Sequence, residues 1–415
     1  MSVRRYSGEV PVAYLRRLTP DPPVQAVAEI VESIRARGDA ALAEFEQRFN
    51  PAAGAGVEPV PPQDLAAALA GIDTGLRAAL ELAIANVRSV SEVQLPAPTS
   101  AELPQGQVVR SLPIPVGSAA AYVPGGRGSY PSTAIMCVIP AKAAGVERIA
   151  LITPARAEGA IDPTVAAVCA LLGVDEVYAI GGAQGIAAMA LGTESIDPVD
   201  VIVGPGNSFV QEAKRQLYGT VGIDGVAGPS ELAIVADASA NPRHIALDLL
   251  SQAEHGPDSI VILASDDSDL LDTVELLLGE VEAPVALVEF DSIDAALDLV
   301  DALAPEHMQI CCELEDARLL AARVKRVGCL LVGHNSATAF GDYVAGSNHV
   351  LPTGGAARFS GPLSTATFMR RMSVVEVPDG ALGELSRAGA TIADAEGFET
   401  HGRSMSERAA NRADG

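Results

Sequence analysis

Apolar side chains in the first hundred residues recur every three or four positions, which is the spacing of an amphipathic helix. Three helices are expected, with apolar faces formed by Val24, Val27, Val31 and Ile34, by Leu42, Phe45 and Phe49, and by Leu76, Leu80, Ile84 and Val87. Gly38 ends the first helix, and Asp39 is a suitable N-terminal cap for the second. A break rich in Pro and Gly follows near 51–62, and residues 1–20 predict a short irregular tail.

From about residue 119 the pattern changes to short apolar runs that alternate with helical segments. The runs predict buried strands at 119–123, 148–153, 176–180 and 199–203, and then at 231–236, 259–264, 284–289, 308–312 and 328–332. Alternation of this kind is typical of parallel sheets covered by helices. The fold class is therefore α/β, with two Rossmann-like parallel units of similar plan and small helical tails at both ends. No internal repeat is strong enough to indicate a duplication.

The periodicity stops after residue 333. The segment 333–365 is rich in Gly, Ser and Asn, and a connection of that length is usually functional or a linker. Residues 375–415 contain short amphipathic pieces and a polar end, which predicts fraying there.

Composition narrows the class of protein. The 415 residues exceed one ordinary core, so two or more domains are expected. Hydrophobic residues make up 48% and aromatic residues only 4%, so the core must consist of aliphatic side chains, as parallel sheets require. The net charge of -25 disfavours a nucleic-acid or anionic-membrane partner, because phosphate binding needs Lys and Arg. The acid excess fits either a solubility role or a salty habitat.

The five cysteines lie in apolar stretches without a CxxC pair, at Cys137, Cys169, Cys311, Cys312 and Cys329. Buried, reduced thiols are the simplest interpretation, and a zinc knuckle is disfavoured. The N-terminus has no apolar signal core, and no apolar run reaches transmembrane length. We therefore expect a cytoplasmic protein with no membrane partner.

Four of the six histidines stand in contexts that suggest chemistry. The first, His255, follows a helix that is predicted to start with Asn241 as its cap and to end at a Gly-Pro pair. Gln252 and His255 are three positions apart, so they share one face and could hold a metal. Alternatively, His255 only complements the helix dipole. On chemistry alone Glu254 would be the better oxygen ligand for zinc.

The second context is the adjacent pair Glu306 and His307, just before an apolar run. A Glu and a His at a strand edge could supply an acid and a base to one pocket, but the pair could equally form a surface turn. The third is the glycine-rich stretch 341–355, which carries Asp342 and His349. Tight turns explain its glycines but not these two side chains.

Glu396 and His401 near the C-terminus form the fourth context, which alone would be interpreted as a solvated helix face. Two glycine loops, 181–184 and 204–207, each follow a predicted strand. Free N–H groups at the helix that follows 204–207 could bind a phosphate. No GxGxxG occurs in such a context, and the glycines could equally serve close helix–strand packing.

Together these segments resemble the histidinol dehydrogenase family. The matching stretches run in family order over nearly the whole chain: GDAALAEFEQRF, AYVPGGRGSYPSTAIM, IGGAQGIAAMALGTESI, GPGNSFVQEAKRQLYG, IDGVAGPSELAIVAD, DLLSQAEHGPDS, APEHMQI, GDYVAGSNHVLPTGGAARFSGPL and EGFETHGRSMSER. The combination is highly specific. It implies zinc- and NAD-dependent oxidation of L-histidinol through L-histidinaldehyde to L-histidine with two NAD, the last steps of histidine biosynthesis.

The resemblance also implies roles for individual residues. Zinc ligands would be Gln252, His255, Asp342 and His401, so the family overrides the preference for Glu254. The catalytic base pair would be Glu306 and His307. Substrate contacts would come from Ser230, Gln252, His255, His307, Asp342, His349, Glu396 and His401. NAD would be contacted near Tyr122, Gln184 and Asn207.

The family further implies an intertwined homodimer in which the C-terminal tail reaches the partner's site. The expected division is an N-terminal tail (1–20), a first α/β domain with the catalytic residues (21–122 plus 232–365), a second α/β domain on the NAD side (123–231) and a C-terminal tail (366–415).

Small departures from the family pattern, such as GSNH and ETHGRS, remove no presumed ligand or base. They leave open a paralogous dehydrogenase of another primary alcohol, such as a sulfonated diol. A non-catalytic NAD- or metal-binding sensor is the third interpretation, and the intact Glu306 and His307 speak against it.

Overall fold

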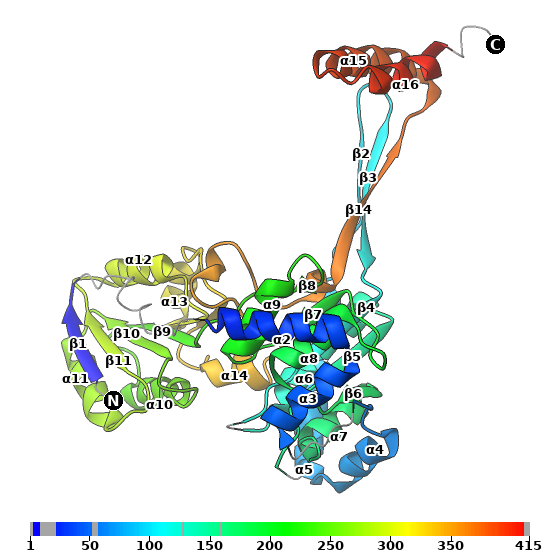
Figure 1. Cartoon of the computed structure of the whole chain (residues 1–415). Helices are drawn as coiled ribbons and strands as arrows, with labels where there is room; N and C mark the ends of the chain where they lie inside the picture. Colours follow the sequence, from blue (N-terminus) through cyan, green and yellow to red (C-terminus); the bar gives the residue numbers. More distant parts are fainter. Residues whose placement is uncertain (1–2, 9–21, 52–56, 127, 158, 411–415) are drawn as a thin grey trace. The chain divides into compact units, whose positions relative to one another are not determined.

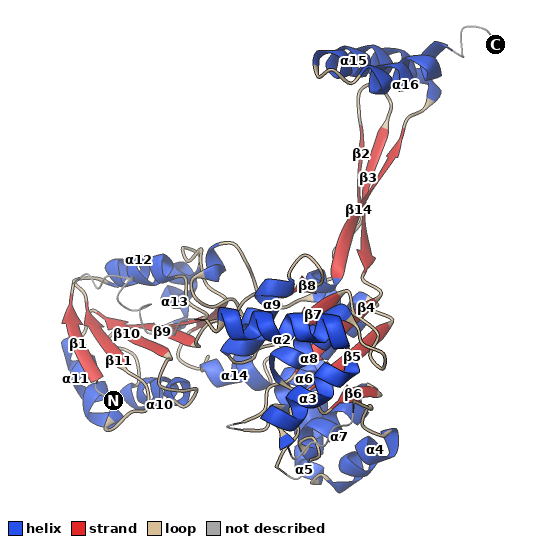
Figure 2. Ribbon diagram, viewed as in Figure 1, coloured by secondary structure: helices blue, strands red, loops and turns tan. Residues whose placement is uncertain are grey.

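The computed structural model describes residues 3–8, 22–51, 57–126, 128–157 and 159–410 (Figure 1). Backbone contacts divide the chain into two compact units. The first comprises Met1–Gln94 and Val116–Phe368, and the second comprises Leu95–Pro115 and Met369–Gly415. The first unit holds two parallel sheets with helices on their faces (Figure 2). The predicted α/β class is confirmed.

One parallel sheet has the strand order β6-β5-β4-β7-β8. Its strands are β4 (Ser118–Tyr122), β5 (Arg148–Ile152), β6 (Glu176–Tyr178), β7 (Val201–Val203) and β8 (Gly222–Ile223). Its crossover helices are α6 (Pro131–Ala144), α7 (Pro163–Leu172), α8 (Gly182–Leu191) and α9 (Ser208–Leu217). The central strands are buried on both faces, which explains why they appear in the sequence as continuous apolar runs.

The N-terminal helices pack against the crossover helices of this sheet. They are α2 (Val24–Arg37), α3 (Asp39–Phe49), α4 (Pro62–Gly71) and α5 (Thr74–Val93). The apolar faces of α2 and α3 share a core with α8, while α4 contacts α7 and α5 contacts α6. The sequence placed 21–122 in one expected domain with 232–365, whereas these helices pack with the sheet formed by β4 to β8. Periodicity identifies which face of a helix is buried, but it does not identify the element that covers this face. Gly38 caps α3 without a side-chain bond, so the expected cap at Asp39 is wrong.

The other parallel sheet has the order β1-β11-β10-β9-β12-β13. Its strands are β1 (Val3–Ser7), β9 (Glu231–Ala236), β10 (Ile260–Ser265), β11 (Val285–Glu289), β12 (His307–Cys311) and β13 (Cys329–Val332). Helices α10 (Pro242–Ala253) and α11 (Ser268–Leu278) share a core with one face, and α12 (Ile293–Leu303) and α13 (Leu314–Ala321) with the other. The second series of predicted strands is confirmed.

Two segments that were expected to be irregular carry regular structure. Residues 3–7 form β1, which pairs with β11 in parallel, whereas 9–20 lie outside the described residues, as do 52–56 of the predicted break. The stretch 333–365 contains helix α14 (Thr338–Tyr343) and a short 3-10 turn (Ala356–Arg358). The amide of Asn348 donates to the carbonyl of Met136 at 2.7 Å and ties the stretch to α6.

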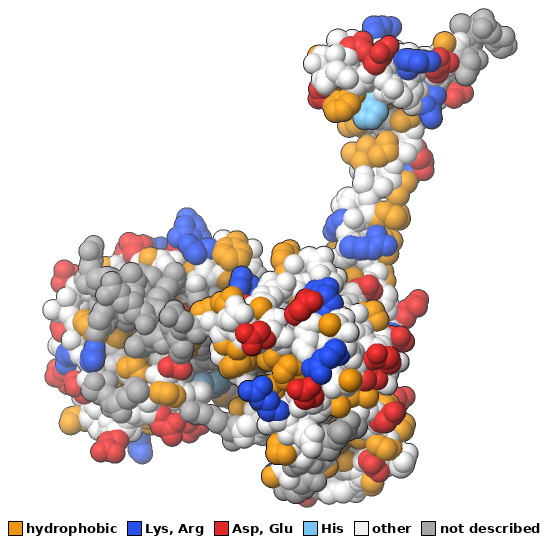
Figure 3. Space-filling model, viewed as in Figure 1, with side chains coloured by type: hydrophobic (Ala, Val, Ile, Leu, Met, Phe, Trp, Pro, Cys, Tyr) orange, Lys and Arg blue, Asp and Glu red, His pale blue; other side chains and the backbone are white. Residues whose placement is uncertain are grey.

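The second unit contains an antiparallel ribbon of β2 (Thr99–Glu102), β3 (Val108–Pro115) and β14 (Met369–Glu376), in the order β14-β3-β2. A helix pair, α15 (Leu382–Ala395) and α16 (Glu399–Ala410), follows β14. The expected C-terminal tail is therefore a folded unit that also includes 95–115. Apolar side chains remain at its surface (Figure 3), among them Val375 and Ile392, which are both 60% exposed. Among the described residues, no helix is long and apolar enough to cross a membrane.

Candidate active site

Glu306 and His307 lie at the amino end of the six-stranded sheet, where β12 begins between β9 and β13. Their exposed fractions are 7% and 5%, so the pair does not form a surface turn. A buried carboxyl and a buried imidazole at a sheet edge are strongly desolvated, and such groups are frequent in functional sites. The preceding loop and the start of β12 thus position two candidate proton-transfer groups side by side.

Glu231, the first residue of β9, anchors Glu306. The two residues exchange backbone–carboxylate hydrogen bonds: Glu231 N donates to Glu306 Oε2 at 2.9 Å, and Glu306 N donates to Glu231 Oε2 at 3.1 Å. Gly354 N donates to the other oxygen of Glu231. Burial raises the pKa of Glu306, and the nearby charge of His307 opposes this only partly. Glu231 was not singled out from the sequence. A Glu at the start of an otherwise apolar strand is unusual and could have indicated a functional position.

His307 is held between two carboxylates. Its Nε2 lies 3.2 Å from Asp342 Oδ1, and its Nδ1 lies 3.8 Å from Glu306 Oε2 without a hydrogen-bond partner among the described residues. Burial alone would lower the pKa of His307, but the hydrogen bond to Asp342 and the charge of Glu306 outweigh it, so the pKa is raised. For Asp342, which lies on α14, burial is likewise outweighed by His307, and its pKa is lowered.

His349 adjoins this group. Its Nδ1 lies 2.8 Å from the carbonyl oxygen of Asp342, and its Nε2 lies 3.1 Å from Thr133 Oγ1 on α6. Burial lowers the pKa of His349, which favours the neutral ring. Thr133 was not among the predicted residues, because only the fold brings α6 to the glycine-rich stretch.

The predicted start of helix α10 is confirmed, since the side chain of Asn241 accepts from Arg243 N. The helix ends at Ala253, earlier than predicted, and packs against α14. Gln252 is 2% exposed, and its Nε2 has no hydrogen-bond partner in the described structure. Glu254 and His255 are exposed.

The charge of His255 contributes to the lowered pKa of Asp342, as expected for neighbouring groups. Among the described residues, no group of three or more His, Cys, Asp or Glu could hold a metal ion.

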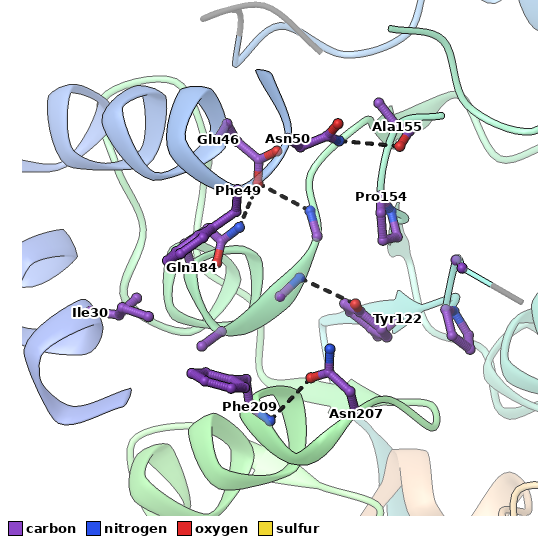
Figure 4. Close-up of a pocket in the computed structure, with 16 residues that line it drawn as sticks. Ile30, Glu46, Phe49, Asn50, Tyr122, Pro154, Ala155, Gln184, Asn207 and Phe209 are labelled. Carbon is purple, nitrogen blue, oxygen red and sulfur yellow. Dashed lines mark hydrogen bonds between the residues drawn. The ribbon is translucent and has the colours of Figure 1, made fainter. Parts of the chain in front are cut away.

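A pocket of about 460 Å³ lies at the carboxyl ends of β4, β5, β6 and β7 (Figure 4). The chain crosses from one side of β4 to the other here, which is the topological switch point where α/β sheets bind ligands. Tyr122, Gln184 and Asn207 all line this pocket.

Polar contacts organise the pocket walls. Gly182 N donates to Tyr122 Oη at 3.2 Å, and burial raises the pKa of Tyr122 to about 12, so the phenol is neutral. At the start of α9, the side chain of Asn207 accepts from Phe209 N and Val210 N, both at 3.1 Å. These two N–H groups are therefore not free for a phosphate.

Comparison with known proteins decides the family. The model of the family described as histidinol dehydrogenase matches residues 17–409. The chain belongs to the histidinol dehydrogenase family. Histidinol dehydrogenase of Thermobifida fusca (strain YX) is 43% identical over 407 residues, covering 93% of this chain and 91% of the relative. That of Streptomyces avermitilis is 42% identical over 405 residues, with 93% and 91% covered.

A solved structure supports the same assignment. The crystal structure of histidinol dehydrogenase from Elizabethkingia anophelis superposes with a TM-score of 0.91 at 29% identity, and 99% of each chain is covered. The likeness thus includes the fold of the whole chain.

The residues implied by the likeness to histidinol dehydrogenases are distributed over both units. The first unit contains Ser230, Gln252, His255, Glu306, His307, Asp342 and His349, besides the three pocket residues. The second unit contains Glu396 and His401. Glu396 caps the C-terminal end of α15, and the ring of His401 on α16 stacks on Phe398 with centroids 5.2 Å apart. Both side chains are exposed.

Proposed function

We propose that this chain oxidises L-histidinol through L-histidinaldehyde to L-histidine, with two NAD as hydride acceptors. The observation that carries the proposal is the group formed by the buried Glu306 and His307 with the half-buried Asp342, in a chain 43% identical to a histidinol dehydrogenase. Family membership favours this substrate over another primary alcohol. The biosynthetic role supports a cytoplasmic location.

His307 is proposed to take the hydroxyl proton in the alcohol step. With Nε2 next to Asp342, the atom available for a proton is Nδ1, which is buried and has no hydrogen-bond partner among the described residues. The carboxylate of Asp342 orients the ring and stabilises its charged form, as carboxylates do beside catalytic histidines.

Glu306 is proposed to activate the water that adds to the aldehyde. A general base is most effective when its pKa is close to the working pH, and burial moves the pKa of Glu306 upward in that direction. The N–H of Glu231 holds one carboxylate oxygen of Glu306 in place.

Zinc would be held by Gln252, His255, Asp342 and the partner's His401. Imidazole nitrogens with oxygen donors suit zinc. Gln252 is 2% exposed and would contribute its amide oxygen. When bound, zinc would act chiefly as a template for the amino and imidazole nitrogens of histidinol. NAD would lie in the pocket beside Tyr122, Gln184 and Asn207 and accept the hydride.

A homodimer is part of the proposal. The second unit presents exposed apolar side chains, including Val375, Ile392 and Phe398, and contact with another copy would remove them from water. Seating this unit on another copy would bring the partner's Glu396 and His401 to the substrate and metal. It would also explain why chemically specialised side chains occur on exposed helices.

The stoichiometry of NADH tests the function. With zinc-loaded protein and excess NAD, we expect two NADH for each L-histidinol consumed and histidine as the product, because both oxidations use one site. A folded, zinc-containing protein that does not turn over histidinol would contradict the proposal. Turnover of dihydroxypropanesulfonate in that case would identify the paralogous activity.

Substitution of Gln252 tests the metal site. The Gln252→Glu variant should retain zinc better than Gln252→Ala, because a carboxylate oxygen replaces the amide oxygen as a donor. Zinc per chain after dialysis is the measurement, and Glu254→Ala on the exposed side of the same segment is the control. Equal zinc loss in both Gln252 variants would show that Gln252 is not a ligand.

A further inference from the structure

The carboxylate of Glu46 forms part of the wall of the candidate cofactor pocket, although Glu46 does not belong to the sheet or to its loops. It lies on α3, and its side chain is 2% exposed. One oxygen, Oε1, accepts from Gln184 Nε2 at 2.8 Å and from Gly181 N at 3.2 Å (Figure 4). Glu46 thus touches the turn that leads into α8, where the dipole of the helix favours a negative charge.

The second oxygen of Glu46 is unsatisfied. Oε2 is buried and has no hydrogen-bond partner among the described residues. Burial also raises the pKa of Glu46. A buried acceptor without a donor costs free energy, so a hydroxyl group of a bound ligand would be stabilised there.

The charge of the pocket points to the kind of ligand group. Of the described residues that line it, Glu46 alone carries a formal charge, and none is Lys, Arg or His. Dinucleotide sites use an acidic residue to accept from the ribose 2′-hydroxyl, and an Arg where a 2′-phosphate must be bound. Here the acid comes from an N-terminal helix and not from the end of a neighbouring strand.

We propose that Glu46 is a specificity residue that accepts a hydrogen bond from the adenosine 2′-hydroxyl of NAD and disfavours the 2′-phosphate of NADP. The inference rests on the proposed function only in requiring that NAD binds in this pocket. If Glu46 merely fixes the turn at 181–184, its loss would weaken both cofactors by the same factor. The ratio of the two affinities therefore separates the two roles.

The test is a fluorescence titration of the full-length, zinc-loaded protein with NADH and, separately, with NADPH. We expect the unaltered protein to bind NADH at least about tenfold more tightly, and Glu46→Gln to reduce this ratio by about tenfold, mostly through tighter NADPH binding. The glutamine keeps an acceptor for Gly181 and Gln184. Glu44→Gln, on the exposed face of α3, is the matched control and should leave the ratio unchanged.

A second measurement needs no variant. NADH that lacks the adenosine 2′-hydroxyl should bind the unaltered protein about tenfold more weakly than NADH. Equal binding of the two, or an unchanged affinity ratio in Glu46→Gln, would overturn the inference while leaving the proposed function intact. Absence of any NADH binding by the unaltered protein would overturn the cofactor assignment and this inference together.

Discussion

Replacing His307 by alanine is expected to lower histidinol turnover by about 10²–10⁴-fold, the usual loss for one general base. The substitution removes the buried Nδ1 that would take the hydroxyl proton, and it also removes the Nε2 that lies 3.2 Å from Asp342 Oδ1. His307 is not among the proposed ligands. The zinc content per chain should therefore stay close to that of the unaltered protein. Steady-state rates and metal analysis on the same preparation are the measurements.

His334→Ala is the matched control. His334 follows β13, at the end of the same sheet opposite to His307, and its Nε2 lies 3.3 Å from Ser239 Oγ. We expect this variant to keep normal turnover. Far-ultraviolet circular dichroism and urea unfolding of both variants would separate loss of chemistry from loss of fold. Normal turnover by a folded His307→Ala protein would refute its role as the base.

Mixing two inactive variants is expected to restore activity. His401→Ala should weaken zinc binding by about 100-fold or more, since losing even an outer partner of a metal ligand costs about 10–100-fold. Suppose that each site takes His401 from the partner. A heterodimer of His401→Ala and His307→Ala then contains one intact site, which combines His307 of the first chain with His401 of the second. Random reassociation should then give about one quarter of the activity of the unaltered dimer.

The arithmetic distinguishes a shared site from a site within one chain. If each chain supplied its own His401, neither site of the heterodimer would be intact and mixing would restore nothing. The control mixes His307→Ala with Glu306→Ala. Both residues are supplied to a site by the same chain, so every site in this mixture lacks one of them and the mixture should stay inactive in either case. No recovery with His401→Ala, despite heterodimers shown by two affinity tags, would refute the shared site. Unchanged zinc content in His401→Ala would do the same.

Local patterns in the sequence were sufficient for much of the first unit. The nine predicted strands all occur, because side chains buried on both faces of a parallel sheet produce short continuous apolar runs. The cap at Asn241 was predictable because it depends only on the next few residues. The order of the family motifs was sufficient to recognise the family, since each motif is local and their combination is specific.

Other elements left no such pattern. β1 is a short edge strand, and β3 and β14 form a ribbon whose side chains are mostly half-buried or exposed, so neither shows a buried run. Helix α2 was predicted, but its packing beside α8 was not. The preference for Glu254 over Gln252 also failed to anticipate burial, since Glu254 is exposed and Gln252 faces the interior.

Local patterns in the sequence were therefore enough to predict the α/β class, the strand series and the family. Packing between distant elements is what brings Glu231 to Glu306, Thr133 to His349, and Glu46 to the turn before α8. These partners are 75, 216 and 135 positions apart. Contacts at such separations depend on how whole elements pack, and periodicity and caps, which act over a few residues, do not encode them.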